Sequence, residues 1–266
     1  MKKPLAALLA WSLLLTPAWA DTLDNIKKRG TLVAGVMYAS PPFGVLNPKT
    51  QTISGYDVDF AAAIAKRLGV KLLAQAVDPA DRIPKLQDGS IDLVLATFTK
   101  NAEREKQVDF SIGYFVTGQK FLVHKGKVRS LDDLEKGTIG VAKGTTSEQQ
   151  LRREMPKAKI KLFDSNKDAA VALSGGTIDA MTSDEPILAG QLSQLPNRKE
   201  FEISNVSISL EIYAVAMKKG EKRLQKEVND TLVEMEKTGE AKRVFEYWFN
   251  ENGPAPMMRS FSIMPL

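Results

Sequence analysis

The sequence predicts an α/β fold in two lobes, each a mostly parallel β-sheet flanked by helices. Between residues 31 and 96, apolar segments of strand length alternate with segments of helical periodicity. The same alternation starts again near residue 120 and continues to about residue 210. A strand–helix–strand order is typical of parallel sheets whose faces are covered by helices. Two such runs therefore indicate two lobes of similar pattern.

The first run follows a short helical segment and contains three expected strands. A helix at 55–68 is predicted because apolar residues recur at helical spacing and Gly69 follows the last turn. Its expected apolar face is Val58, Ala61, Ala62, Ala65 and Leu68. The expected helices are 23–29, 55–68 and 81–87, and the expected strands are 31–36, 70–77 and 91–96.

The second run repeats this order, and the chain then ends in two helices and an apolar tail. The last helix finishes in an aromatic cluster, residues 245–249. The tail, residues 257–266, is either a strap over the first lobe or a partner-binding segment. The expected strands are 121–124, 138–141, 159–163, 178–181 and 213–217, and the expected helices are 131–135, 148–154, 167–174, 187–192, 222–238 and 241–249.

Residues 1–20 have the features of a secretory signal peptide. Lys2 and Lys3 precede a short apolar core, and Ala18-Trp19-Ala20 places small residues at the cleavage positions. We expect a mature chain that starts at Asp21 and resides in the bacterial periplasm, the alternative being an uncleaved anchor. Without cysteine the chain forms no disulfide, so its core alone must hold the fold.

The charge pattern argues against nucleic acid as a partner. The chain has 37 basic and 32 acidic residues, a net charge of +5, and the two signs alternate, as they do around 218–223. A solvated surface of mixed charge is expected rather than a basic stripe. With a single histidine, His124, and no cysteine, the sequence offers no metal cluster or nucleophile. We expect no cofactor and no enzymatic activity.

The segment 91–114 carries the strongest functional signal. Thr97 and Thr99 follow the strand expected at 91–96, and Asn101 is expected to cap a helix whose first turn carries Arg104. A guanidinium and the free amides of a helix start both favour a carboxylate. Taken alone, this pattern fits an ordinary strand–helix junction equally well.

Two further junctions carry complementary groups. Gly144, Thr145, Thr146 and Ser147 precede a helix, where a glycine lets the backbone approach a ligand. Asp184 follows another expected strand and would accept donors. Ligands of open α/β sheets bind beyond the carboxyl ends of the strands, where these three junctions are expected to meet. Donors opposite one carboxylate suit a zwitterion, although each junction alone is also explained as a helix cap.

Five segments of the chain resemble the family 3 periplasmic solute-binding proteins, the amino-acid receptors of ATP-driven importers. They occur in order over nearly the whole expected mature chain. They are GYDVDF (55–60), LATFTKNAEREKQVDFS (95–111), GVAKGTTSE (140–148), IDAMTSDEPILAG (178–190) and TGEAKRVFEYWF (238–249).

The resemblance implies the type II periplasmic-binding-protein fold, in which two crossover strands join the lobes and the lobes close on a free amino acid. Lobe 1 would comprise residues 21–118 and 212–266, and lobe 2 residues 119–211. The resemblance also implies that the closed form delivers its ligand to the membrane permease of an ABC importer. We expect a monomer.

The resemblance also implies roles for individual residues. Arg104 would bind the α-carboxylate with help from Thr99 and Thr146. Asp184 would pair with the α-ammonium, and Thr97 would contribute its carbonyl or hydroxyl. Tyr38 and Thr145 complete the expected pocket, with Ser40 and Phe43 as further candidates for its wall, although Phe43 is equally well explained as a core residue.

The segment 81–87, DRIPKLQ, is similar to a loop of the glutamate/aspartate-binding members. Arg82 would then reach an acidic ligand side chain, and glutamate or aspartate is the expected ligand. Met37 and Asn166 stand where some acidic-amino-acid receptors carry a basic or imidazole group. Glutamine or another polar amino acid therefore remains an alternative.

Two other classes of function remain open. Cyclohexadienyl dehydratases are similar to such receptors, and an enzyme on this scaffold would have Glu185 as its candidate general acid. We expect His124 to be structural. A soluble sensor that reports its closed state to a separate receptor is the second alternative.

Overall fold

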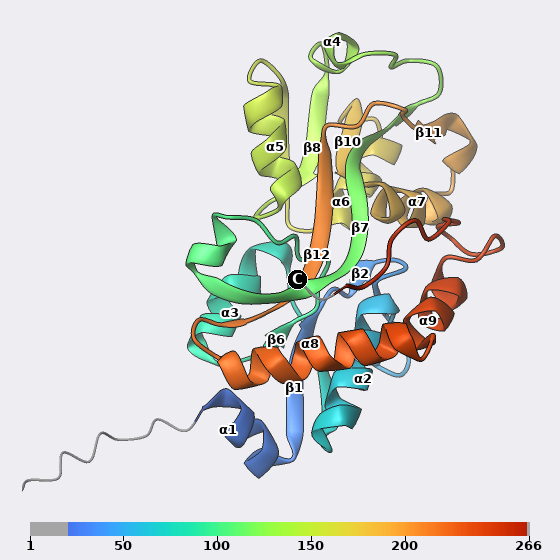
Figure 1. Ribbon diagram of the computed structural model, residues 1–266. Coiled ribbons are helices and arrows are strands. Elements are labelled where there is room, and N and C mark those ends of the chain that lie inside the picture. The colour runs from blue at the N-terminus through green and yellow to red at the C-terminus, as the bar shows by residue number, and fades with distance from the viewer. Residues whose placement is uncertain (1–20, 265–266) are drawn as a thin grey trace, which may run out of the picture.

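The computed structural model describes residues 21–264 and shows two lobes, one above the other (Figure 1). The expected signal peptide, residues 1–20, lies outside the described residues. None of the helices formed within residues 21–264 is long and apolar enough to cross a membrane. The main sheet has nine strands in the order β5-β1-β6-β12-β7-β10-β8-β9, and β11 pairs with β7.

The lower lobe holds the first three strands of this order and a small sheet of its own. Strand β1 pairs in parallel with β5 and with β6, and the pairing with β5 runs from Thr31 opposite Lys71 to Val36 opposite Ala76. Its strands are β1 (Thr31–Val36), β2 (Ala39–Ser40), β3 (Gly44–Leu46), β4 (Ile53–Ser54), β5 (Lys71–Ala76) and β6 (Leu93–Val94). Its helices are α1 (Thr22–Arg29), α2 (Tyr56–Leu68), the 3₁₀ turn η1 (Pro79–Asp81), α3 (Arg82–Asp88), η2 (Arg104–Lys106), α8 (Lys222–Lys237) and α9 (Glu240–Trp248).

The upper lobe repeats the alternation of strands and helices. Strand β8 lies between β9 and β10 and pairs in parallel with both, whereas β10 is antiparallel to β7. Its strands are β8 (Thr138–Ala142), β9 (Lys159–Phe163), β10 (Ala180–Asp184) and β11 (Phe201–Ile203). Its helices are α4 (Leu131–Leu134), α5 (Thr146–Glu154), α6 (Asn166–Ser174), α7 (Glu185–Gln194) and the 3₁₀ turn η3 (Arg198–Glu200).

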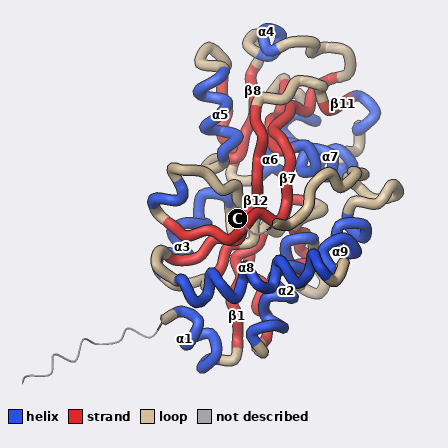
Figure 2. Tube along the Cα trace, in the orientation of Figure 1, coloured by secondary structure: helices blue, strands red, loops and turns tan. Residues whose placement is uncertain are grey.

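Two long antiparallel strands join the lobes through the middle of the molecule (Figure 2). They are β7 (Val108–His124) and β12 (Ser209–Lys218), and their pairing extends from Ser209 opposite Gln119 to Lys218 opposite Val108. We propose that this crossing divides the lobes as the sequence suggests, with 21–118 and 212–264 below and 119–211 above.

Three expectations about local structure were wrong. Arg104 begins a three-residue 3₁₀ turn rather than an α-helix, because β7 starts at Val108, only two residues after the turn. A turn of this length offers no helix N-terminus to a ligand. Strand β6 is shorter than the expected 91–96. In α2, Ala62 is exposed, and the buried face includes Phe60 and Ile64 instead.

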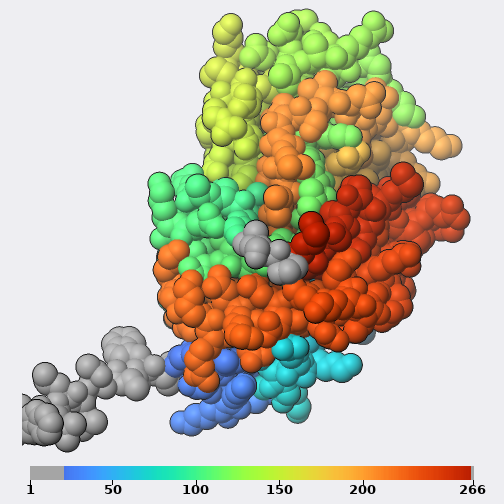
Figure 3. Space-filling view, in the orientation of Figure 1, coloured from blue at the N-terminus to red at the C-terminus, as the bar shows by residue number. Residues whose placement is uncertain are grey.

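The chain ends as a strap over the lower lobe (Figure 3). The Phe261 ring lies 5.2 Å from the Phe115 ring and 5.8 Å from the Phe245 ring, between centroids. Arg259 Nη1 donates to Glu236 Oε1 at 3.0 Å. Ile263 is buried in the same apolar core as α2, α8 and α9. Up to residue 264, the tail therefore packs against its own chain.

Candidate functional site

A polar cavity lies between the two lobes, next to the crossing strands. Most of its lining is hydroxyl, amide or charged, and both lobes contribute. The lower lobe contributes Met37, Pro79, Arg82, Thr97 and Arg104. The upper lobe contributes Thr145, Thr146, Ser147, Asn166, Ser183, Asp184 and Ile187. All three sequence-predicted junctions therefore meet at one cavity.

Arg104 is held by the turn that follows Thr99. Asn101 Oδ1 accepts a hydrogen bond from the Arg104 backbone N–H at 2.9 Å, so the expected cap contact forms although the helix does not. The guanidinium donates to the Thr99 carbonyl at 2.8 Å and to the Gly144 carbonyl of the upper lobe at 3.3 Å. It stacks over the Phe98 ring at 4.2 Å. These contacts use two of its five N–H donors and leave the others for an anion.

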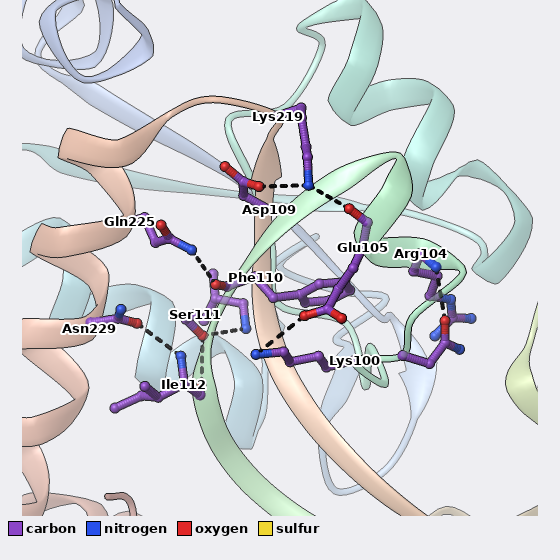
Figure 4. Close-up of polar contacts among 12 residues, drawn as sticks. Lys100, Arg104, Glu105, Asp109, Phe110, Ser111, Ile112, Lys219, Gln225 and Asn229 are labelled. Atoms are coloured by element: carbon purple, nitrogen blue, oxygen red, sulfur yellow. Dashed lines mark hydrogen bonds and ion pairs between the residues drawn. The ribbon is translucent and has the colours of Figure 1, made fainter. Parts of the chain in front are cut away.

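The segment between Arg104 and β7 is anchored by charged contacts to the lower lobe (Figure 4). Lys219 Nζ donates to the Glu105 carbonyl at 2.5 Å and pairs with the Asp109 carboxylate at 3.0 Å. Lys100 Nζ lies 3.5 Å from the Glu105 carboxylate. The turn that positions Arg104 is thus fixed at both ends.

Asp184 lies at the end of β10 and faces the cavity from the upper lobe. Its Oδ2 accepts a hydrogen bond from the Tyr213 hydroxyl of β12. Its Oδ1 is buried and has no hydrogen-bond partner among the described residues. Although Asp184 precedes α7, its side chain does not cap that helix. A buried carboxylate oxygen without a donor is costly, so this atom is prepared for a cationic or hydrogen-bonding ligand.

Burial disfavours the charged forms of both Asp184 and Arg104. Burial and, to a smaller extent, the nearby Glu211 carboxylate raise the pKa of Asp184 to about 7, against the lowering effect of the Tyr213 hydroxyl and the two arginines. Burial lowers the pKa of Arg104 to about 10, against the opposing effect of Glu211 and Asp184. Arg104 thus stays protonated at neutral pH, whereas Asp184 is near the midpoint of its titration.

Arg82 lines the cavity, but its guanidinium is largely occupied by the protein. It donates to the carbonyls of Pro79 at 2.9 Å, Ala96 at 2.9 Å and Thr97 at 3.3 Å. A fourth bond of 3.1 Å reaches the Gly144 carbonyl across the lobe boundary. Four carbonyl partners leave one N–H for a ligand, less than the sequence-based role would use.

Thr97 is held in an unusual backbone conformation. Its φ of 47° lies in the left-handed region, which a β-branched residue rarely adopts. The Asp57 carboxylate of α2 accepts from the Thr97 backbone N–H at 2.9 Å and from the Tyr114 hydroxyl at 2.7 Å. Asp57 was not among the residues that the sequence predicted at the site. The signal was an acidic residue in the first turn, next to the helix's buried face.

Thr145 and Thr146 have different parts in the upper lobe. Thr145 Oγ1 accepts from the Glu148 backbone N–H at 3.1 Å and is the N-cap of α5. Thr146 Oγ1 donates to Glu211 Oε2 of β12 at 2.9 Å and lies 3.4 Å from Thr99 Oγ1 of the lower lobe. Thr99 thus contacts the site without lining the cavity. Glu211, almost fully buried, was not predicted, because nothing in the sequence shows that β12 passes the cavity.

Several expected pocket residues lie elsewhere. The Tyr38 hydroxyl donates to Asp78 Oδ1 at 2.9 Å, and the residue lines a separate surface depression. Ser40 and Phe43 are fully buried, Phe43 within the aromatic core of the lower lobe. The sequence around Pro41 and Pro42 contains no pattern that distinguishes a core residue from a cavity residue.

The two side chains considered for catalysis, His124 and Glu185, have protein contacts outside the cavity. His124 packs against Phe201, with ring centroids 4.4 Å apart. Glu185 is half-exposed and accepts from Lys120 Nζ at 2.7 Å. Neither lines the cavity. Among residues 21–264, no three histidine, cysteine or acidic side chains are placed to hold a metal ion. Arg104 of the lower lobe and Asp184 of the upper lobe thus bring groups of opposite charge type to the same cavity.

Comparison with known proteins identifies relatives across most of the chain. The family model for bacterial extracellular solute-binding proteins, family 3, matches residues 32–251. The ABC transporter glutamine-binding protein GlnH of Bacillus subtilis is 39% identical over 237 residues, which is 87% of this chain and 86% of that protein. The glutamate/aspartate import solute-binding protein of Escherichia coli is 30% identical over 276 residues, covering 96% and 90% of the two chains.

Solved structures show the same fold. An ancestral arginine-binding protein bound to glutamine is 40% identical, with a TM-score of 0.79 over 84% of this chain and 99% of that one. The ancestral amino acid-binding protein AncCDT-1, a precursor of cyclohexadienyl dehydratase, is 36% identical, with a TM-score of 0.78 over 87% and 100% of the two chains. The glutamine-binding relative is more similar in sequence than the glutamate/aspartate-binding relative, so the expected acidic ligand is not confirmed.

Proposed function

This chain belongs to the bacterial extracellular solute-binding proteins of family 3, and from that premise we propose that it is the receptor of an ABC importer for a free polar amino acid, with glutamine preferred. Residues 1–20 would direct it to the periplasm. The observation that carries the proposal is Asp184 Oδ1, a buried carboxylate oxygen without a partner among the described residues, in the cavity that Arg104 enters from the opposite lobe.

The ligand would join the two lobes through its charged groups. Its α-carboxylate would accept the remaining donors of Arg104, with the hydroxyls of Thr97 and Thr146 nearby. Its α-ammonium would donate to Asp184 Oδ1. A ligand held from both lobes has a higher affinity for the closed state and therefore drives closure.

The surroundings of the ligand side chain favour a neutral polar group. Four carbonyls already occupy Arg82, so it offers little to neutralise a second carboxylate. Asp184 and Glu211 already oppose the two guanidinium groups, and the Asp57 carboxylate lies behind Thr97, so the cavity has no excess of positive charge for a side-chain carboxylate. The Asn166 amide lines the cavity with its Oδ1 unpartnered, and it can pair with a glutamine amide in either orientation.

A thermal-shift screen of the twenty amino acids tests the ligand class. At about 100 times its dissociation constant, a ligand adds roughly 2.7 kcal/mol to the free energy of unfolding, which such a screen detects. We expect glutamine to give the largest shift. If glutamate or aspartate gave the largest shift, the expectation that Arg82 binds an acidic ligand side chain would be restored. If a cationic amino acid gave the largest shift, the proposed preference for a neutral side chain would be contradicted.

Removing either end of the clamp should abolish tight binding. Arg104→Ala or Asp184→Ala leaves a ligand charge buried without its partner, which costs roughly 2–5 kcal/mol of binding free energy. Titration calorimetry measures the loss. Arg153→Ala and Glu185→Ala are matched controls, since both side chains are charged and lie outside the cavity. Normal binding by either clamp variant would refute the proposed site.

The enzymatic alternative has a direct test. The protein would be incubated with prephenate or arogenate, and the mixture would be analysed for dehydration products. We expect no turnover, because neither His124 nor Glu185 reaches the cavity.

A further inference from the structure

We propose that one face of α7 is a latch that holds the lobes together by contacts that do not involve the ligand, and that Gly190 sets how far the lobes can close. The latch comprises Ala189, Gly190 and Gln191, whereas Ile187 of the same helix lines the cavity and is not part of the latch. It deepens the proposed function by naming a determinant of affinity that is separate from the determinants of specificity.

Helix α7 belongs to the upper lobe but contributes to the cores of both lobes. Leu188 is buried in an upper-lobe cluster, and Leu192 packs against that cluster. Ile187 is buried in the core cluster of the lower lobe, and Ala189 packs against the same cluster. One helix thus has a face for each lobe, and its lower-lobe face becomes buried only when the lobes meet.

Gly190 lies at a close approach of the upper lobe to the lower-lobe backbone. A Cβ on this residue would lie 2.0 Å from the carbonyl oxygen of Pro41 in the lower lobe and 3.1 Å from Pro41 Cγ. Distances this short exclude any side chain in the closed state. Glycine is disfavoured inside a helix relative to alanine, so α7 gives up helix propensity at this position. The lobe contact provides a physical reason for that choice.

Gln191 adds a directional contact beside this point. Its Nε2 donates to the Ala39 carbonyl of β2 at 2.7 Å, and the side chain is almost fully buried. The bond joins an upper-lobe side chain to a lower-lobe backbone carbonyl. Gly190 and Gln191 do not line the polar cavity, so they act apart from any ligand contact.

The effect of such a latch on binding follows from population shift. Contacts that exist only in the closed state raise the closed fraction of the free protein, and the affinity for any ligand that needs closure rises by the same factor. A latch variant should therefore weaken all ligands equally and leave their ranking unchanged. Variants of residues that would touch the ligand side chain, such as Asn166, should change the ranking.

Gly190→Ala is the direct test. In the open state the methyl group meets no lower-lobe backbone and improves helix propensity, so the melting temperature without ligand should stay constant or rise. In the closed state the methyl group clashes with Pro41, so affinity should fall at least about tenfold. Gly175→Ala is the control, because its added Cβ would make only ordinary contacts at 3.4 Å and 3.9 Å, within the upper lobe.

Three measurements decide the question. Small-angle scattering without ligand should give a larger radius of gyration for Gly190→Ala than for wild type. Calorimetry with glutamine and glutamate should show equal fold-losses for the two ligands. Gln191→Ala removes a bond without adding bulk, and it should give a smaller loss of the same kind even if Gly190→Ala fails to fold.

Two results would overturn the latch. One is unchanged scattering and wild-type affinity in both variants. The other is a loss confined to one ligand, which would make these residues specificity determinants. If wild-type protein binds no amino acid, the proposed function fails, whereas the scattering comparison still tests the latch.

Discussion

At the scale of single residues, the Asp184 carboxylate determines how binding should depend on pH. Burial and the Glu211 carboxylate both raise its pKa, which is about 7, whereas the Tyr213 hydroxyl, Arg104 and Arg82 lower it. Without ligand the group is therefore partly protonated at neutral pH. A ligand ammonium at Oδ1 would favour the ionised form and lower the pKa.

Binding should therefore release protons near pH 7 and strengthen as pH rises. Below pH 7 the proton must leave Asp184 before the ammonium pairs with it, and the cost grows by up to about tenfold in affinity per pH unit. We expect binding at least about fivefold weaker at pH 5.5 than at pH 7.5. Calorimetry at pH 7 in two buffers of different ionisation enthalpy measures the released protons. Proton uptake on binding, or pH-independent affinity, would contradict the role of Asp184.

Glu211→Gln tests the cause of this shift. Removing the Glu211 charge removes one of the two effects that raise the pKa of Asp184. The midpoint of the pH dependence should then move to lower pH. Glutamine retains an oxygen that can accept from Thr146 Oγ1, so the contact between β12 and α5 is preserved. A midpoint that stays in place would show that burial alone sets the pKa.

Individual residues also show how much of the candidate site could be predicted from the sequence. Thr97, Arg104, Thr146 and Asp184 could be predicted because each follows a recognisable strand, and the ends of parallel strands meet. The hydrogen bonds of Arg82 to the protein could not be predicted. Its partners are backbone carbonyls from separate segments, and every residue type has such a carbonyl, so the sequence does not indicate which ones lie near Arg82.

At the scale of elements, α2 supports the site from behind. Its Asp57 holds both the Thr97 backbone and the Tyr114 hydroxyl of β7, so one helix connects the cavity to a crossing strand. Burial raises the pKa of Asp57 to about 7, although both hydrogen bonds lower it. Between the ordinary carboxyl pKa and pH 7 the folded chain binds the extra proton, so this group makes stability fall as pH rises through that range.

Asp57→Ala should destabilise the fold and weaken binding together. The Thr97 N–H and the Tyr114 O–H would lose their acceptor in a buried place, at about 1–3 kcal/mol for each group. Urea unfolding should show a loss of about 2–5 kcal/mol, and calorimetry a weaker affinity through the displaced Thr97. Asp57→Asn, which keeps the volume and one acceptor, should lose less. Unchanged stability in Asp57→Ala would contradict this support.

The elements themselves were predictable where periodicity is local. The strands 31–36 and 159–163 match the observed bounds, and helix α8 differs from its prediction by one residue at the C-terminus. The long strand β7 was recognised only at 121–124. It contains buried polar residues and two glycines between the lobes, so its sequence lacks the alternation that marks a strand with one solvent face.

At the scale of the whole molecule, the core of the lower lobe is built from segments that are far apart in the sequence. The same apolar core receives α2 from the first part of the chain, β7 from the middle, and α8, α9 and the strap from the end. The sequence left the tail as either a strap or a partner-binding segment. The placement of Phe261 against Phe115 and Phe245 favours the strap.

The strap should therefore contribute to stability and not to ligand binding. Phe261→Ala removes a partly buried ring from the aromatic core, and the free energy of unfolding should fall by about 2–3 kcal/mol, less than for a fully buried ring. Urea unfolding measures the change, and Met258→Ala is the control in the same strap, since Met258 is 89% exposed. Glutamine affinity should be unchanged in both variants, because neither Phe261 nor Met258 lines the cavity. Wild-type stability in Phe261→Ala would leave the tail free for a partner and remove the argument for a strap.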